Sequence, residues 1–203
     1  MHLLLDTASL YYRSYYALPE SMTAPDGFPH NAVRGFLSTL ARLITTYRTT
    51  EIACAWDEDW RPDWRVRLLP TYKTHRVTEA SGGETEETPE TLGPQVDAIA
   101  RLLDAMGIAR PGAAGFEADD VVGTLAATLP GDIVVVSGDR DLVQLVDERV
   151  RLLLTVNGGM DKWPLLAPQD VYERFGVEPH RYVELAVLRG DPSDGIPGIP
   201  GIG

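Results

Sequence analysis

The 203-residue sequence has little sulfur and little histidine: it contains one cysteine, Cys54, and four histidines. One cysteine cannot build a disulfide framework, and one cysteine with four scattered histidines excludes a structural zinc site. Long hydrophobic runs are absent as well, because no apolar stretch approaches the ~20 residues that a membrane-spanning helix needs. The first five residues run directly into Asp6, so we expect no signal peptide, no membrane association and a cytoplasmic location.

Positive charge is also scarce, since 18 basic residues stand against 30 acidic ones and give a net charge of −12. This balance argues against a protein that coats nucleic acid, because such a protein needs a broadly basic surface. The basic residues are nevertheless unevenly distributed. A cluster of basic and aromatic side chains comprises Trp60, Arg61, Trp64, Arg65, Arg67, Tyr72, Lys73 and Arg76. It fits either a solvated helix face or an arch that binds phosphates, and the acidic residues 79–90 after it are typical of a loop.

Short apolar runs alternate with amphipathic helical patterns along the chain. The runs are nearly continuous in apolar residues, which is typical of strands buried on both faces of a parallel sheet. This alternation predicts an α/β fold with a mostly parallel central sheet flanked by helices. The predicted strands are residues 2–5, 52–56, 133–137 and 150–154. The predicted helices are residues 31–47, with Asn31 as N-cap, and residues 89–106, 117–129, 168–175 and 179–189.

Carboxylates follow three of these strands at the point where each strand ends. Asp6 follows the first run, Asp57 the second, and Asp139 and Asp141 the third. The helix predicted from residue 117 begins with three further acids, Glu117, Asp119 and Asp120. One acid at a helix N-terminus is ordinary, because it interacts favourably with the helix dipole. Seven at one edge of a sheet repel one another strongly unless they are protonated or neutralised by cations.

Cations at this edge are predicted to be metal ions. No histidine or lysine lies within the acidic motifs, so we expect no neutralisation by side chains. Oxygen ligands without nitrogen or sulfur favour Mg²⁺ or Mn²⁺ over zinc. The number of carboxylates suggests two ions, ~3.5–4 Å apart, as in enzymes that carry out in-line displacement at phosphorus. Neither a phosphate-binding loop with its lysine nor a serine nucleophile elbow is present.

Three longer segments carry a family resemblance. Residues 116–126, 137–146 and 188–203 resemble, in order, signature blocks of the 5′-3′ exonuclease and flap endonuclease family, which includes the 5′-nuclease domain of bacterial DNA polymerase I. The resemblance implies a PIN-like nuclease fold over residues 1–165, with a helical arch at about residues 58–90. Residues 166–203 resemble the start of a helix-three-turn-helix that binds DNA, which the sequence leaves incomplete.

The resemblance also implies roles for particular residues. Two Mg²⁺ or Mn²⁺ ions would be held by nine carboxylates, namely Asp6, Asp57, Glu117, Asp119, Asp120, Asp139, Asp141, Asp191 and Asp194. Lys73, Arg65 and Arg76 resemble the catalytic cations of the arch, and Tyr72 lies in the same DNA-binding element. Gly198, Gly201 and Gly203 resemble the turn that contacts duplex DNA with help from a K⁺ ion.

The function implied is a metal-dependent, structure-selective DNA nuclease of replication and repair. Its expected partners are DNA with 5′ flaps, nicks or 5′ ends and a DNA polymerase, and we expect a monomer. Two alternatives share part of the pattern: a PIN-type ribonuclease, and a protein that binds DNA structures through an inactive metal site. The sequence departs from the family pattern at Thr7, where many members have glycine, and at Gly195, where asparagine is usual.

Overall fold

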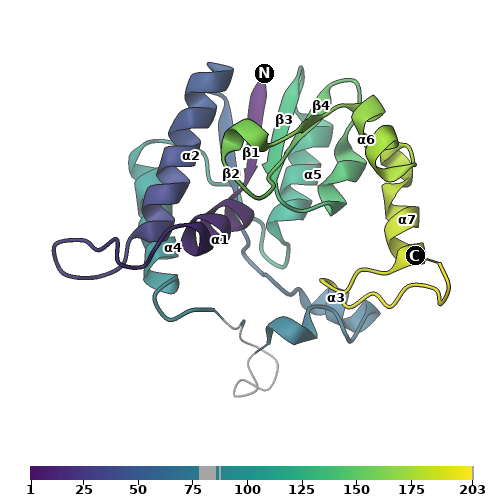
Figure 1. Ribbon diagram of the computed structural model, residues 1–203, viewed down its shortest axis with the longest axis horizontal. Helices are drawn as coiled ribbons and strands as arrows, with labels where there is room; N and C mark the ends of the chain where they lie inside the picture. The colour runs from purple at the N-terminus through teal and green to yellow at the C-terminus, as the bar shows by residue number, and fades with distance from the viewer. Residues whose placement is uncertain (78–85, 87, 203) are drawn as a thin grey trace.

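A five-stranded sheet forms the centre of the protein, and its strands lie in the order β2-β1-β3-β4-β5 (Figure 1). The computed structural model describes residues 1–77, 86 and 88–202. Parallel pairing joins β1 (His2–Asp6), β2 (Ile52–Ala55), β3 (Ile133–Ser137) and β4 (Val150–Leu154), whereas β5 (Leu165–Leu166) is antiparallel to β4. The four predicted strands and the α/β architecture are confirmed. The sequence did not predict β5, because two residues are too short for any periodicity.

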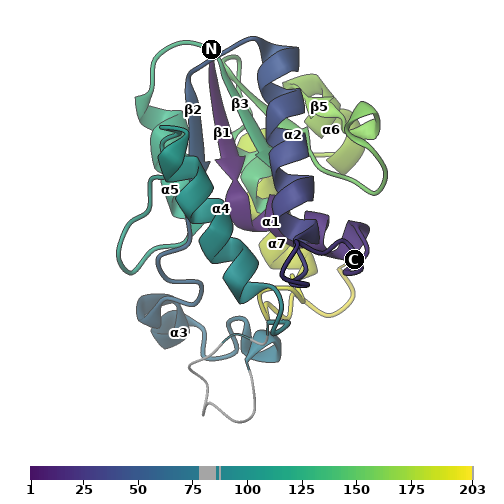
Figure 2. The same cartoon turned by 90° about the vertical axis from the view of Figure 1, so that its left-hand side faces the viewer.

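Helices cover both faces of the sheet (Figures 1 and 2). One face packs against α1 (Thr7–Ala17), α2 (Asn31–Tyr47) and α4 (Gly93–Ala105), and the other packs against α5 (Ala118–Thr128), α6 (Pro168–Phe175) and α7 (Tyr182–Arg189). The alternation of side chains along β1 supplies both cores: Leu3 and Leu5 join the first, and Leu4 joins the second. Each such fully buried leucine contributes about 1.5–3 kcal/mol of transfer free energy.

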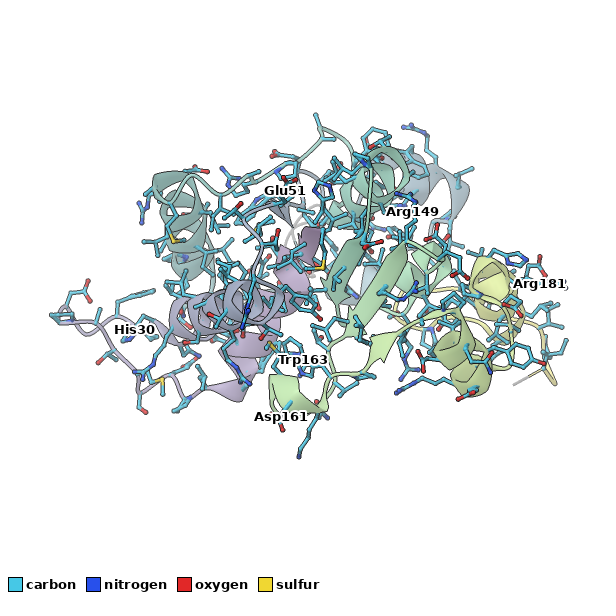
Figure 3. All side chains as sticks on the ribbon, turned by 90° about the horizontal axis from the view of Figure 1, so that it is seen from above. His30, Glu51, Arg149, Asp161, Trp163 and Arg181 are labelled. Atoms are coloured by element: carbon cyan, nitrogen blue, oxygen red, sulfur yellow. The ribbon has the colours of Figure 1, made fainter. Side chains whose placement is uncertain are left out.

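Two side chains near the ends of secondary-structure elements, Arg149 and Trp163, connect the sheet side of the molecule to its covering helices (Figure 3). Arg149, the residue before β4, donates hydrogen bonds to the carbonyl oxygens of Leu129, Gly131 and Ala126 at the C-terminus of α5, where a cation is favoured. Trp163, after the short helix η4 (Met160–Lys162), is buried in the core that includes Leu10 of α1. Within the described ranges, no helix combines the length and apolar character that crossing a membrane requires.

The remaining short elements lie mostly at the carboxyl ends of the strands. These are α3 (Asp63–Leu68), η1 (Thr74–Arg76) and η3 (Asp141–Leu145), while η5 (Pro179–Arg181) leads into α7. In Figure 1 the strands β1 and β2 point down toward α3 and toward the turn at the C-terminal end of the chain. We call residues 61–77 the arch base. Most of the acidic stretch predicted to be a loop lies outside the described residues.

Two helix predictions need correction. Residues 7–17 form α1, which the sequence did not predict: Asp6 caps it by accepting from Ser9 N at 3.1 Å. Asn31 is not an N-cap. It is the first residue of α2, and its side-chain nitrogen donates to the carbonyl oxygens of Tyr15 and Leu18 at 2.8 and 3.0 Å. These buried contacts satisfy the amide better than a cap would, because they join α1 to α2 without access to water.

Candidate active site

A cavity of about 670 Å³ opens where the parallel strands end. Its wall combines residues from β1, the segment after β2, the start of α5, the turn after β3 and the segment after α7, which are far apart in the sequence. Six of the nine predicted metal ligands line it: Asp6, Asp57, Glu117, Asp119, Asp139 and Asp191. The other three, Asp120, Asp141 and Asp194, are absent from its wall. The expected convergence of carboxylates is therefore found for six residues.

Backbone and hydroxyl groups hold the carboxylates at the ends of β1 and β2. Asp6 accepts from Ser137 Oγ at 2.5 Å, which links β1 to β3. Asp57 accepts from the backbone nitrogen of Ala118 at 2.8 Å, which ties the end of β2 to the first turn of α5. The strands thus place the acids. Ala118 N holds one oxygen of Asp57, whereas both oxygens of Asp6 are engaged, one by Ser137 and the other by Ser9 N.

The carboxylates are unfavourable charges in this arrangement. Burial raises the pKa of Asp6 to about 6, and the charges of Asp57 and Asp139 add to the rise. Burial, together with Asp139, Asp194 and Asp191, raises the pKa of Asp141 to about 7. Burial and the neighbouring carboxylates, of which Asp6 has the largest effect, raise the pKa of Asp119 well above its usual value. Such shifts mark a site that cations would stabilise.

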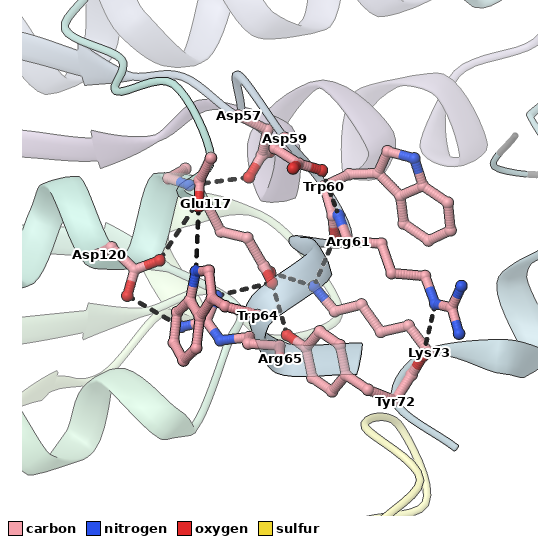
Figure 4. A network of polar contacts seen from close by, with 12 residues as sticks. Asp57, Asp59, Trp60, Arg61, Trp64, Arg65, Tyr72, Lys73, Glu117 and Asp120 are labelled. Carbon is pink, nitrogen blue, oxygen red and sulfur yellow. Dashed lines mark hydrogen bonds and ion pairs between the residues drawn. The ribbon is translucent and has the colours of Figure 1, made fainter. Parts of the chain in front are cut away.

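Glu117 shows a different environment, which the sequence did not predict (Figure 4). Its side chain is buried at 4% exposure, and three groups of the arch base point at its two oxygens. Arg65 Nη1 and the Tyr72 hydroxyl donate to Oε1, each at 2.7 Å, and Lys73 Nζ forms an ion pair with Oε2. Arg65 also donates to Asp120 Oδ1 at 2.9 Å. The expectation that no side chain neutralises these acids is wrong, because cations distant in sequence reach them.

These contacts bear on whether the site fits a metal ion. The lining acids offer oxygen donors alone, which suits Mg²⁺ or Mn²⁺. As the side chains stand, however, no three His, Cys, Asp or Glu residues in the described part of the chain could enclose one ion. Glu117 and Asp120 are turned to Arg65, while Asp6 and Asp57 accept from other protein groups. The donor set fits divalent ions, provided that some of these carboxylates exchange their present partners.

The glycine-rich segment, residues 190–202, carries the last two predicted ligands, Asp191 and Asp194, and contacts the arch base. An isolated bridge pairs Asp191 with Ile196, and Thr71 Oγ1 donates to the carbonyl oxygen of Gly195 at 3.1 Å. Gly195 has a φ of +76°, and a Cβ there would lie 2.4 Å from the carbonyl oxygen of Thr71. This close approach gives a structural reason for glycine at a position where the family usually has asparagine.

The predicted DNA contacts lie around this same region. Gly198 has a φ of +69° and packs against the backbone of Arg189, while Gly201 is open to solvent and Gly203 is outside the described residues. Arg76 lines the cavity beside Glu86. Tyr72 is only 8% exposed and donates to Glu117, so its contact with DNA stays a prediction.

Comparison with known proteins decides the family. A family model described as "5′-3′ exonuclease, N-terminal resolvase-like domain" matches residues 1–176. The chain belongs to the 5′-3′ exonuclease family. It is 52% identical over 205 residues to a 5′-3′ exonuclease of Streptomyces coelicolor, covering 99% of this chain and 68% of that protein. It is 38% identical over 205 residues to DNA polymerase I of Mycobacterium tuberculosis, covering 99% of this chain and 22% of the polymerase.

Solved structures of exonuclease relatives show the same fold. A flap endonuclease of bacteriophage T5, in a pseudo-enzyme-product complex with DNA and metal ions, superposes with a TM-score of 0.73 at 21% identity. The match covers 99% of this chain and 70% of that one. The chain thus spans about two thirds of the length of its stand-alone exonuclease relatives.

In this member of the 5′-3′ exonuclease family, aromatic residues line the cavity beside the acids, and only Trp60 among them was singled out from the sequence. Tyr11 and Tyr12 of α1 join Trp56 and Trp60 in the wall. The rings of Tyr11 and Tyr12 are 5.1 Å apart, and those of Tyr11 and Trp56 are 6.4 Å apart. The missed signal was helical spacing: Ala8 of α1 also lines the cavity, and Tyr11 and Tyr12, three and four residues later, share its helix face.

Proposed function

We propose that this chain is a divalent-metal-dependent 5′-3′ exonuclease and flap endonuclease that hydrolyses phosphodiester bonds in DNA. One observation carries the proposal: carboxylates from five separate parts of the chain surround one cavity at the carboxyl edge of a parallel sheet. Ligands of open α/β sheets bind at this edge. Family membership supports the reaction, since relatives of similar sequence are named 5′-3′ exonucleases.

The metal centre would use the carboxylates around the cavity. Asp6, Asp57, Glu117, Asp119 and Asp120 would hold one ion, while Asp139, Asp141, Asp191 and Asp194 would hold or share a second. Divalent ions, when bound, supply Lewis acidity that activates the attacking water and neutralises charge at phosphorus. The raised pKa values of Asp6 and Asp141 support this assignment, because a neighbouring cation would stabilise the ionised form of both carboxyls.

The chain's own cations would act on the phosphate. Lys73, Arg65 and Arg76 extend from the arch base, and Lys73 and Arg76 line the cavity. A positive group aimed at oxygens that gain charge in the transition state lowers the barrier more than it strengthens ground-state binding. The aromatic wall of Tyr11, Tyr12, Trp56 and Trp60 would stack on an unpaired base next to the scissile bond.

The substrate we propose is DNA with a 5′ flap, a nick or a free 5′ end. The cavity joins the arch base to the glycine-rich segment, so single-stranded and duplex parts of one substrate could lie on its two sides. Gly198 and Gly201 would approach duplex phosphates, with a K⁺ ion bound at the same turn. A DNA polymerase is the proposed partner, since the sequence matches part of DNA polymerase I.

A cleavage assay tests this function. Three substrates of matched sequence would be compared, each with Mn²⁺, with Mg²⁺ and with EDTA: a 5′-flap DNA, a nicked DNA duplex and an RNA of the flap sequence. We expect metal-dependent cleavage of both DNAs and little cleavage of the RNA. Preferential cleavage of RNA would favour a PIN-type ribonuclease. Tight binding of flap DNA without cleavage under any metal would favour a binding protein.

A further inference from the structure

The cations of the arch base occupy the carboxylates that a metal ion would need. Glu117 has both oxygens engaged, Oε1 by Arg65 and Tyr72 and Oε2 by Lys73 (Figure 4). Arg65 spans from Glu117 to Asp120, so one guanidinium holds two of the predicted ligands. A carboxylate oxygen engaged by a buried cation has less negative charge to offer to an ion.

Backbone conformation and hydrogen bonds within the arch base hold Arg65, Tyr72 and Lys73 in these positions. Lys73 has a left-handed backbone, with φ of +50°, which a non-glycine residue adopts only where its surroundings enforce it. Arg61 Nε donates to the carbonyl oxygen of Tyr72 at 2.7 Å, and Trp64 Nε1 donates to that of Gly115 at 3.1 Å. The Tyr72 ring lies between two cations, with its centroid 5.8 Å from the Arg65 guanidinium and 5.1 Å from Lys73 Nζ.

We propose that Arg65, Tyr72 and Lys73 form a latch that replaces divalent ions at Glu117 and Asp120 and competes with them for these carboxylates. The latch neutralises the acidic cluster while metal is absent and docks the arch base on the start of α5. Metal binding displaces Lys73 and Arg65 from Glu117, which frees both cations for the phosphates of a nucleic acid. The latch couples the arch base to the metal centre by a single set of exchangeable contacts.

This inference rests on the metal centre of the proposed function, and its consequences can be measured without substrate. Removing a cation of the latch should strengthen metal binding, because the metal no longer competes with it. The same change should destabilise the metal-free protein, because Glu117 is then left buried beside other acids without its counter-charge. A residue that merely orients Glu117 for the metal would give the opposite sign, namely weaker metal binding.

The test is titration of the full chain with Mn²⁺, in which free Mn²⁺ is measured by its electron paramagnetic resonance signal. The variants are Lys73→Met, which keeps the apolar stem, Arg65→Ala and Tyr72→Phe. Arg67→Ala is the matched control, because Arg67 is an exposed arginine of the same helix. We expect Kd for Mn²⁺ to fall at least about fivefold in Lys73→Met and Arg65→Ala. A fivefold change in affinity is about the smallest effect that coupled binding sites usually have on each other. Arg67→Ala should change Kd less than about twofold, since its charge is screened.

Thermal melts provide the second measurement. Lys73→Met should melt at a lower temperature than the wild-type protein in EDTA, and saturating Mn²⁺ should remove most of this difference. Unchanged or weaker Mn²⁺ binding in both charge-removing variants would overturn the latch, as would an equal gain in Arg67→Ala. Failure of the wild-type protein to bind Mn²⁺ would overturn both the latch and the metal centre. The expected changes in Kd without any cleavage of flap DNA would leave the latch standing and refute the nuclease function.

Discussion

At the scale of single residues, the ionised carboxylates of the cavity lower the stability of the metal-free protein, because they are buried close to one another. Asp119 lies among Asp6, Asp57 and Asp139, and burial with these neighbours raises its pKa well above the usual value. The cluster keeps charges that cost stability in the metal-free protein. A variant that removes one of these charges should therefore change stability and cleavage in opposite directions.

Asp119→Asn should stabilise the metal-free protein and lower flap cleavage by more than about 10²-fold, since loss of an inner ligand costs more than loss of its supporting contacts. Urea unfolding in EDTA and a cleavage assay measure the two effects. Asp97→Asn is the control, because Asp97 is exposed on α4. An active Asp119→Asn protein would remove this residue from the metal centre.

Lys73→Ala should lower the single-turnover rate of cleavage at saturating metal by about 10²–10³-fold, the usual effect of losing one transition-state contact. Affinity for flap DNA in Ca²⁺ should change little, because one phosphate contact among several alters the salt dependence by only about one unit. Rapid-quench kinetics measures the single-turnover rate, and fluorescence titration measures the affinity for flap DNA. A variant that loses affinity but keeps its rate would make Lys73 a binding residue.

At the scale of elements, the glycine-rich segment after α7 connects the C-terminal part of the chain to the arch base. The connection is close at Gly195, whose backbone lies against the carbonyl group of Thr71. Asp191 and Asp194 both precede this contact, and their charges help to raise the pKa of Asp141. The position of two predicted ligands therefore depends on one turn.

Gly195→Ala should destabilise the protein by about 1–3 kcal/mol or more, since alanine is strained at a φ of +76° and its Cβ would lie 2.4 Å from Thr71 O. It should also weaken Mn²⁺ binding by displacing Asp191 and Asp194. Gly93→Ala is the control, because a Cβ at Gly93, the first residue of α4, would contact nothing within 4 Å. Equal stability of the two variants in urea would show that the turn relaxes without cost.

At the scale of the whole molecule, buried acids make stability depend on pH. The pKa of Asp6 is about 6 and that of Asp141 about 7, both above the value of an unfolded aspartate, ~3.9. The folded state therefore binds more protons than the unfolded state between these values. The free energy of unfolding must then decrease as pH rises through this window.

In metal-free buffer, the two shifts together should lower the free energy of unfolding by up to about 4 kcal/mol between about pH 5 and pH 8. Urea titrations at several pH values measure it, and an Asp6→Asn, Asp141→Asn double variant should flatten the slope. In saturating Mn²⁺ the slope should reverse, because metal binding requires deprotonated carboxylates. A flat profile for the wild-type protein in EDTA would show that these acids lie in a more hydrated environment.

The sequence by itself determined four of the strands, their parallel direction and the edge at which Asp6, Asp57, Glu117, Asp119 and Asp139 meet. Short apolar runs that alternate with helical patterns are typical of strands buried on both faces, and parallel strands end at a common edge. The prediction that Asp191 and Asp194 are metal ligands came from family resemblance alone, because no periodic pattern in the sequence connects the segment after α7 to the first strands.

Only the tertiary structure decided which cations lie on which acids. Arg65, Tyr72 and Lys73 are 44 or more residues from Glu117, and no local spacing reports a contact over such a distance. The same holds for Asn31, whose buried bonds to Tyr15 and Leu18 override its preference for a cap. Local propensity is worth about 1 kcal/mol at such a position, whereas leaving a buried amide or carboxylate without a partner costs more.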